Sequence, residues 1–132
     1  MPVTNLDKKT WLATKITKAD TFVTRLLGLL RRKRLAPEEA LWLVPGKAVH
    51  TVGMKFPIDV IFIDRDKKVV ALVSALAPNR ATRFYLGAHS ILELPKGTIL
   101  KSRTEAGDHL DISSAESAAV ADLTETPLEE VA

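Results

Sequence analysis

The chain has 132 residues, a length that fits one domain with a hydrophobic core of its own. It contains no cysteine, which excludes disulfide bonds, thiolate metal sites and a cysteine nucleophile. No stretch approaches the roughly 18 to 20 consecutive apolar residues that a membrane-spanning helix needs, and the N-terminus shows no apolar signal segment, so we expect a cytoplasmic protein without membrane insertion.

The net charge of +3 hides an uneven distribution along the chain. All 19 lysines and arginines lie within residues 1–104 together with 8 of the 16 acids, whereas residues 105–132 carry 8 acids and no base. One interpretation is that the basic part attracts an anionic partner, such as nucleic acid or a phosphorylated ligand. The other, which we favour because charge runs are usually solvated surface, is that the acidic end lies against the basic face and cancels its field.

The N-terminal part of the chain predicts a strand followed by a helix. Apolar residues alternate with Thr and Lys over residues 11–18, a pattern typical of a strand. Asp20 then provides an N-cap, and apolar residues at spacings of three and four from Phe22 to Leu30 predict one amphipathic helix. The basic cluster 31–34 ends this helix, where positive charge suits the negative end of the helix dipole.

Short strands separated by turns are predicted for the rest of the chain up to residue 112. An extended run is expected at 48–52, and strands at 40–44, 60–63, 69–73, 90–95, 98–101 and 109–112. Residues 60–63 are apolar on both faces, which predicts a central strand covered on each side, and a polar turn joins them to 69–73 in a β-hairpin. The predicted architecture is α+β but mainly β: a small antiparallel β barrel or sandwich with one N-terminal amphipathic helix packed on it.

The composition changes after residue 112 to Ala, Ser, Thr and acids, with no aromatic residue. Such a segment buries too little apolar surface to offset the entropy of ordering. We therefore predict a single globular domain over residues 1–112 and a flexible acidic tail over residues 113–132.

Several short blocks stand in a characteristic order along the chain. They are Arg25-Leu-Leu-Gly-Leu-Leu-Arg-Arg32, His50-Thr51, Met54, Phe56-Pro-Ile-Asp-Val-Ile-Phe-Ile-Asp64, Leu92-Glu-Leu-Pro-Lys-Gly97 and Gly107-Asp108. In order and spacing they resemble the family catalogued as domain of unknown function 192, over about residues 10–112. The resemblance implies a small, mostly antiparallel β domain with one N-terminal helix, and it implies no established activity. One departure is Gly46, where one branch of the family often carries cysteine.

The central block contains the residues best suited to catalysis or ligand binding. His50 can carry a proton near neutral pH, Asp59 can orient it or act as a base, and Thr51 offers a hydroxyl. A structural role competes with each function. For His50 we favour a part-buried ring bonded to backbone, and for Asp59 we weigh catalysis equally against a carboxylate that accepts backbone amides where the strand begins.

Charged residues outside that block add further candidates. Arg25 and Arg32 lie seven residues apart and so share a helical face, from which they meet an anionic ligand or pair with Glu93 or Asp59. Arg83 lies in a loop that is expected to border the same cleft. Glu93 alternates with two leucines, so we expect it to face solvent or a polar cleft. The remaining histidines lack acidic neighbours at ligand spacing, so no metal site is expected.

Three functions are compatible with this pattern, in decreasing order of preference. The first is a ligand- or partner-binding module, for a small molecule or a protein, whose ligand-binding residues are His50, Thr51, Asp59, Arg25 and Arg83. The second is a hydrolytic or acid–base enzyme that uses His50 and Asp59. The third is nucleic-acid binding through the basic cluster 31–34, which ranks last because most aromatic residues look buried. No phosphate-cradling loop or dinucleotide motif is present, and we expect a monomer without a cofactor.

Overall fold

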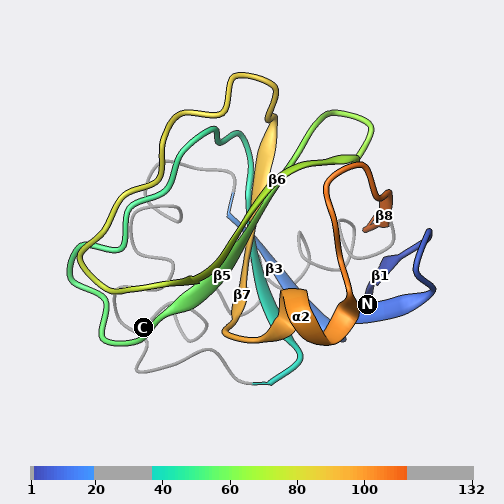
Figure 1. Cartoon of the computed structure of the whole chain (residues 1–132), viewed down its shortest axis with the longest axis horizontal. Coiled ribbons are helices and arrows are strands. Elements are labelled where there is room, and N and C mark those ends of the chain that lie inside the picture. The colour runs from blue at the N-terminus through green and yellow to red at the C-terminus, as the bar shows by residue number, and fades with distance from the viewer. Residues whose placement is uncertain (1, 20–36, 113–132) are drawn as a thin grey trace.

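The computed structural model describes residues 2–19 and 37–112, which form two β-sheets and one short helix (Figure 1). One sheet has three strands in the order β2 (Thr10–Ala13), β1 (Val3–Asn5) and β8 (Leu110–Asp111). The other has five strands in the order β3 (Lys15–Ala19), β4 (Glu39–Leu43), β7 (Ser90–Pro95), β5 (Ile58–Ile63) and β6 (Val69–Leu76). The helix expected from Asp20 to the basic cluster and the tail expected at 113–132 lie outside the described residues.

The prediction of a mainly β, mostly antiparallel domain is confirmed, with one parallel pair as the exception. Strands β3 and β4 pair in parallel, from Lys15 opposite Glu39 to Ala19 opposite Leu43, while the other pairs are antiparallel. Residues 20–38 connect β3 to β4, and a connection of that length permits the crossover that a parallel pair requires. As described, the five-stranded sheet ends at β3 and β6, so these strands do not close into a barrel.

The single strand expected at 11–18 is two strands that belong to different sheets. The chain leaves β2 at Ala13 and enters β3 at Lys15. The carbonyl oxygen of Glu38 accepts the amides of both Thr14 and Lys15, at 2.8 and 3.1 Å, which fixes the junction. The residue pattern over 11–18 does not mark this junction, because such a pattern reports which face a side chain takes and not which sheet the strand joins.

Strand β5 forms the centre of the core, as its apolar sequence predicts. All six residues from Ile58 to Ile63 are buried, and β5 pairs with β7 on one side and β6 on the other. The two faces of the five-stranded sheet carry separate apolar clusters, one around Ile61, Leu92 and Trp42 and the other around residues such as Phe62. Burying side chains of this size stabilises the fold by about 1.5 to 3 kcal/mol each.

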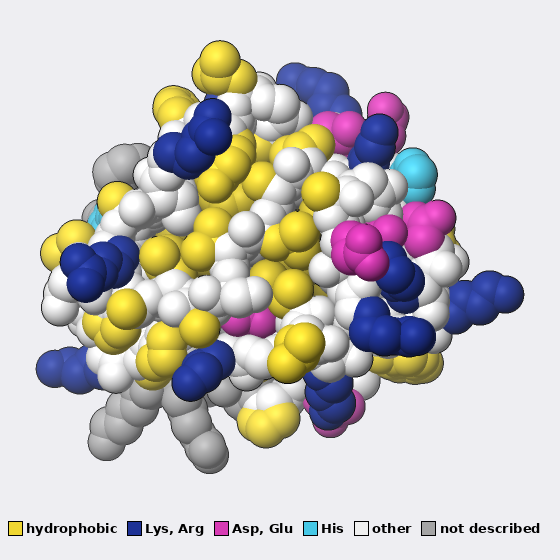
Figure 2. Space-filling model, viewed as in Figure 1, with side chains coloured by type: hydrophobic (Ala, Val, Ile, Leu, Met, Phe, Trp, Pro, Cys, Tyr) yellow, Lys and Arg dark blue, Asp and Glu magenta, His cyan; other side chains and the backbone are white. Residues whose placement is uncertain are grey.

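The predicted hairpin of β5 and β6 is confirmed, and its turn is built around Asp64. The Asp64 carboxylate accepts the amides of Asp66 and Lys68, at 2.8 and 3.0 Å, and Lys67 adopts a positive φ of 63°. Strand β6 lies at the edge of the sheet, and most of its apolar side chains are only half-buried. Figure 2 shows the face of the molecule that is turned to the viewer in Figure 1. Apolar side chains gather in the middle of that face, with lysines and arginines mainly around its periphery.

The strand expected at 98–101 is instead helix α2 (Thr98–Ser102). Gly97 precedes it with φ 96°, the Thr98 hydroxyl donates to the Pro95 carbonyl oxygen at 2.7 Å, and Arg103 ends it in the left-handed region. A short apolar run such as Thr-Ile-Leu has no period that separates strand from helix, so the local pattern does not decide. The expected strand at 109–112 is the two-residue β8, and the extended run at 48–52 makes one isolated bridge, from His50 to Ala81.

Candidate functional site

Asp59 lies inside the protein with its carboxylate fully engaged by backbone. It is 1% exposed, its Oδ1 accepts the Ala75 amide at 2.8 Å, and its Oδ2 accepts the Ile99 amide at 2.8 Å. Ala75 stands at an irregularity in the pairing of β6 with β5, with φ 51°, so the carboxylate supplies the acceptor that the interrupted ladder lacks there. These contacts are of the structural kind that the sequence allowed for Asp59.

Thr51 organises the two loops that follow β4 and β6. Its hydroxyl donates to the Ala77 carbonyl oxygen at 2.6 Å and accepts the Arg80 amide at 2.9 Å. Its backbone amide donates to the Arg80 carbonyl oxygen, and its carbonyl oxygen accepts the Asn79 amide. Thr51 is completely buried, so its hydroxyl is occupied by the backbone of the neighbouring loop.

The structure does not join His50 to Asp59 by a hydrogen bond within the described residues. His50 is exposed at the bridge to Ala81, so the expectation of a part-buried ring is wrong. Both oxygens of Asp59 are taken by amides. Arg83 is exposed, and its guanidinium lies 5.0 Å from the centre of the Tyr85 ring, a cation–π contact. Arg25 lies outside the described residues. The shared cleft of these residues therefore stays a prediction.

Glu93 is buried, so the expectation that it faces solvent or a polar cleft is wrong. It is 6% exposed and sits between Leu41 and Val60 in the sheet register. Burial raises the pKa of Glu93 to about 8, because the carboxylate form would lose its hydration. Thr17 is opposite Leu41 in the same row, and its buried hydroxyl finds no hydrogen-bond partner among the described residues. The face that carries the Phe62 cluster therefore also holds two polar groups.

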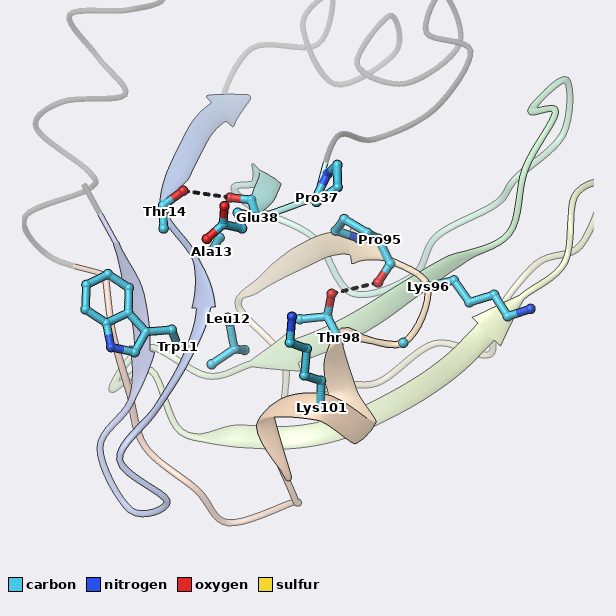
Figure 3. A pocket seen from close by; sticks show the side chains of 11 residues that line it. Trp11, Leu12, Ala13, Thr14, Pro37, Glu38, Pro95, Lys96, Thr98 and Lys101 are labelled. Carbon is cyan, nitrogen blue, oxygen red and sulfur yellow. Dashed lines mark hydrogen bonds between the residues drawn. The ribbon is translucent and has the colours of Figure 1, made fainter.

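A pocket of about 510 Å³ lies between β2 and α2, away from the segment that the sequence singled out (Figure 3). We call it the β2–α2 pocket, and it is lined by Trp11, Leu12, Ala13, Thr14, Pro37, Glu38, Pro95, Lys96, Gly97, Thr98 and Lys101. Its volume lies within the range of about 300 to 1,000 Å³ that small-molecule sites occupy.

Trp11 and Lys101 give this pocket its chemical character. Trp11 is 63% exposed, which leaves an aromatic surface in solvent at one wall. Figure 3 shows the Lys101 side chain running from α2 into the space beside Thr98, while the Lys96 side chain points away. Glu38 brings one carboxylate to the lining. The pocket thus combines an aromatic surface, an inward ammonium group and one carboxylate.

Asp59 fixes the position of α2, which forms part of the lining of this pocket. Its bond to the Ile99 amide holds the first turn of α2, and α2 supplies Thr98 and Lys101 to the lining. Ile58, the neighbour of Asp59, pairs with Pro95 at the end of β7. The sequence indicated that Asp59 was important, but it did not indicate that Trp11 and Lys101 line one pocket. The sequence pattern grouped Trp11 with the apolar residues of its predicted strand, so it gave no signal that the indole is exposed.

Other ionisable groups near the termini of the domain serve the fold. Burial tends to raise the pKa of Asp108, but hydrogen bonds from Asn5, Lys8 and the Glu105 amide outweigh it and lower the pKa to about 2. Residues 2–19 and 37–112 contain no group of three or more metal-binding side chains. No helix of this part of the chain is long and apolar enough to cross a membrane.

Comparisons with known proteins agree with the block pattern of the sequence. The family model DUF192, described as Uncharacterized ACR, matches residues 3–112. A UPF0127 protein of Pyrococcus furiosus is 35% identical over 116 residues, covering 81% of this chain and 94% of the relative. A UPF0127 protein of Thermococcus sibiricus is 34% identical, covering 78% of this chain and 68% of the relative.

Two solved structures share the fold at low sequence identity. One is a protein of unknown function from Novosphingobium aromaticivorans, with a TM-score of 0.72, 20% identity and 84% of each chain covered. The other is a putative transcription regulator from Sinorhizobium meliloti, with a TM-score of 0.64 and 22% identity, covering 73% of this chain and 79% of that one. Both likenesses concern the fold.

Proposed function

The chain belongs to the DUF192 family, and we propose that it is a ligand-binding module that takes a small organic anion with a flat apolar part into the β2–α2 pocket. The observation that carries the proposal is that exposed Trp11 and the Lys101 side chain of α2 line the same pocket. An exposed indole offers a face for a ring, and an ammonium group offers a partner for a carboxylate or another acidic group.

The walls of the pocket favour binding without a large rearrangement. Leu12 and Ala13 are buried core residues of β2, and α2 is held by Asp59 and by the bond from Thr98 to Pro95. A preformed site loses little conformational entropy when a ligand enters. The Glu38 carboxylate repels a second negative charge on the ligand. The pocket therefore favours a ligand with a single acidic group, placed beside Lys101.

Paired charge variants test this assignment. The probes are naphthalene-2-carboxylate and its neutral carboxamide, followed by quenching of tryptophan fluorescence and by calorimetry. We expect Lys101→Gln to weaken carboxylate binding about five-fold and to leave carboxamide binding unchanged, since a partly exposed charge pair contributes up to about 1 kcal/mol. We expect Glu38→Gln to tighten carboxylate binding, because it removes a repulsion.

Two further variants separate the pocket from general surface effects. Trp11→Ala should abolish binding of both probes, while Lys55→Gln should change neither, because the exposed Lys55 is not part of the pocket lining. Equal loss in Lys55→Gln and Lys101→Gln would show that the probes respond to overall charge, and the proposed site would be wrong. Binding that survives Trp11→Ala unchanged would also overturn it.

A further inference from the structure

A second, smaller cavity lies where the β5–β6 turn meets β4 and β7. Its volume is about 140 Å³, and its lining includes Trp42, Asp64, Arg65, Lys67, His89 and Ser90. It shares no residue with the β2–α2 pocket. A cavity of this size lies below the range for whole small-molecule ligands, so it suits a single compact group.

Positive charge accumulates at this cavity without being neutralised by ion pairs. Arg65 and Lys67 line it, and Lys47 lies close enough that its charge, with theirs, adds to burial in lowering the pKa of His89. Within residues 2–19 and 37–112, none of these three cations forms an ion pair. Lys47 donates to the carbonyl oxygens of Leu86 and Ala88, at 2.8 and 2.6 Å, which are neutral acceptors.

The carboxylate in the lining is already committed to the turn. Asp64 Oδ1 accepts the amides of Asp66 and Lys68, which orients the carboxylate along the β5–β6 turn. Its single charge is smaller than the sum of Arg65 and Lys67. The cavity therefore keeps a net positive charge even when His89 is neutral.

Ser90 presents a buried hydrogen-bond donor at the same place. Its hydroxyl oxygen accepts the indole N–H of Trp42 at 2.9 Å, and Ser90 is 1% exposed. Because the oxygen is the acceptor in that bond, the hydroxyl proton remains available, and no acceptor for it is present in the described part of the chain. A buried donor without an acceptor, at the wall of a cationic cavity, is what an oxyanion would satisfy.

Lys67 is held in position beside this donor. Its ammonium group lies 5.7 Å from the centre of the Trp42 ring, and its backbone has the positive φ of the turn. The Trp42 side chain thus touches both the Lys67 cation and the Ser90 hydroxyl. The guanidinium of Arg65 adds the planar fork of donors that suits phosphate oxygens.

We propose that this cavity binds the terminal phosphate group of a phosphomonoester, with Arg65, Lys67 and the Ser90 hydroxyl as donors. The phosphoryl group fills the cavity, and the rest of the ligand remains outside over the exposed β5–β6 turn. His89 adds a further donor when it is protonated, so a bound dianion attracts a proton to its ring.

Three probes distinguish the possible sources of such a phosphate. They are inorganic phosphate, phenyl phosphate, and a single-stranded oligonucleotide without terminal phosphates, each titrated while the Trp42 indole N–H and the His89 ring are followed by NMR. We expect both phosphate and phenyl phosphate to shift the Trp42 signal in a saturable way and to raise the pKa of His89. Binding of the oligonucleotide alone would overturn the assignment to a monoester.

Matched double variants separate the cavity from general electrostatic attraction. We expect Arg65→Gln with Lys67→Gln to weaken phenyl phosphate binding at least ten-fold, while Lys9→Gln with Lys55→Gln, which removes the same charge elsewhere, retains it. Both pairs lie in turns or loops, so folding is checked simply by an unchanged Tm. Equal weakening in both pairs, or no saturable shift of the Trp42 signal, would show that the cavity is not a phosphate site.

Discussion

Asp59 accepts the amide of Ile99 at 2.8 Å, and this bond ties the buried strand β5 to helix α2. The other carboxylate oxygen accepts the Ala75 amide at the irregularity in β6. One side chain therefore completes the backbone hydrogen bonding of two elements that belong to different parts of the chain. Its position behind α2 also makes it a positioning residue for the β2–α2 pocket.

Replacing Asp59 should destabilise the fold before it affects any ligand. Asp59→Asn retains one acceptor but places an amide group against a backbone N–H, so we expect a loss of about 1 to 3 kcal/mol in the free energy of unfolding. Urea denaturation measures this loss. Asp66→Asn, in the exposed turn, serves as the control with little effect. A variant at Asp59 with wild-type stability would contradict the structural role.

Thr51 permits a sharper test, because two substitutions separate its hydroxyl from its shape. Thr51→Val keeps the volume but leaves the Arg80 amide and the Ala77 carbonyl oxygen without their side-chain partner, so we expect a loss of about 1 to 3 kcal/mol. Thr51→Ser keeps the hydroxyl and should recover most of the stability. Equal losses in the two variants would mean that packing of the methyl group matters more than the hydroxyl.

Glu93 should make stability fall as the pH rises. The pKa of Glu93 is raised to about 8 in the folded protein, so between the ordinary glutamate pKa and 8 the folded state holds a proton that the unfolded state releases. Stability is then greatest below about pH 4.5 for this group and is lost progressively up to about pH 8. Each unit of pKa shift corresponds to about 1.36 kcal/mol, so the loss amounts to several kcal/mol.

The control for this prediction is Glu93→Gln, which has the same shape and cannot ionise. Urea denaturation at pH 5, 7 and 9 gives the difference in unfolding free energy between wild type and variant. We expect the unfolding free energy of the variant to rise relative to that of the wild type as the pH rises. Taking the difference between the two proteins cancels the contributions of the other titrating groups. A difference that stays constant from pH 5 to 9 would show that Glu93 is not buried as a neutral acid.

Asp108 should make stability fall as the pH is lowered in the acidic range, which is opposite in direction to the effect of Glu93. Its pKa is lowered to about 2, so its contribution is complete above the ordinary aspartate pKa and disappears as the pH falls through 2. We expect Asp108→Asn to cost about 1 to 2 kcal/mol at pH 6 and almost nothing at pH 2, relative to wild type. Thermal unfolding at the two pH values measures it. A cost that is the same at both would point to lost shape and not to lost charge.

The central hairpin could be predicted from the sequence because its determinants are local. Ile58 to Ile63 is apolar on both faces, and Asp64 begins a turn whose bonds all fall within four residues. The same holds for β4 and β7, whose apolar runs end at prolines or glycines. The family could be recognised for the same reason, because its blocks are short stretches with their own patterns of packing and turns.

The features that concern function depended on contacts between distant residues. The parallel pairing of β3 with β4, the burial of Glu93 between two neighbouring strands, and the helix at Thr98 are each decided by what lies opposite in the fold. Periodicity reports only the face that a side chain takes. It cannot report which element covers that face or which ends of the chain come together.

The sequence by itself thus determined the β-rich core, the central hairpin and the family. Only the tertiary structure placed Trp11 and Lys101 on one pocket and Arg65, Lys67 and Ser90 on one cavity. The physical reason is that apolar burial repeats along a strand, whereas a binding site requires a few polar groups to converge through folding. Asp59 illustrates the difference: its importance was visible in one block, but its partner lies forty residues away.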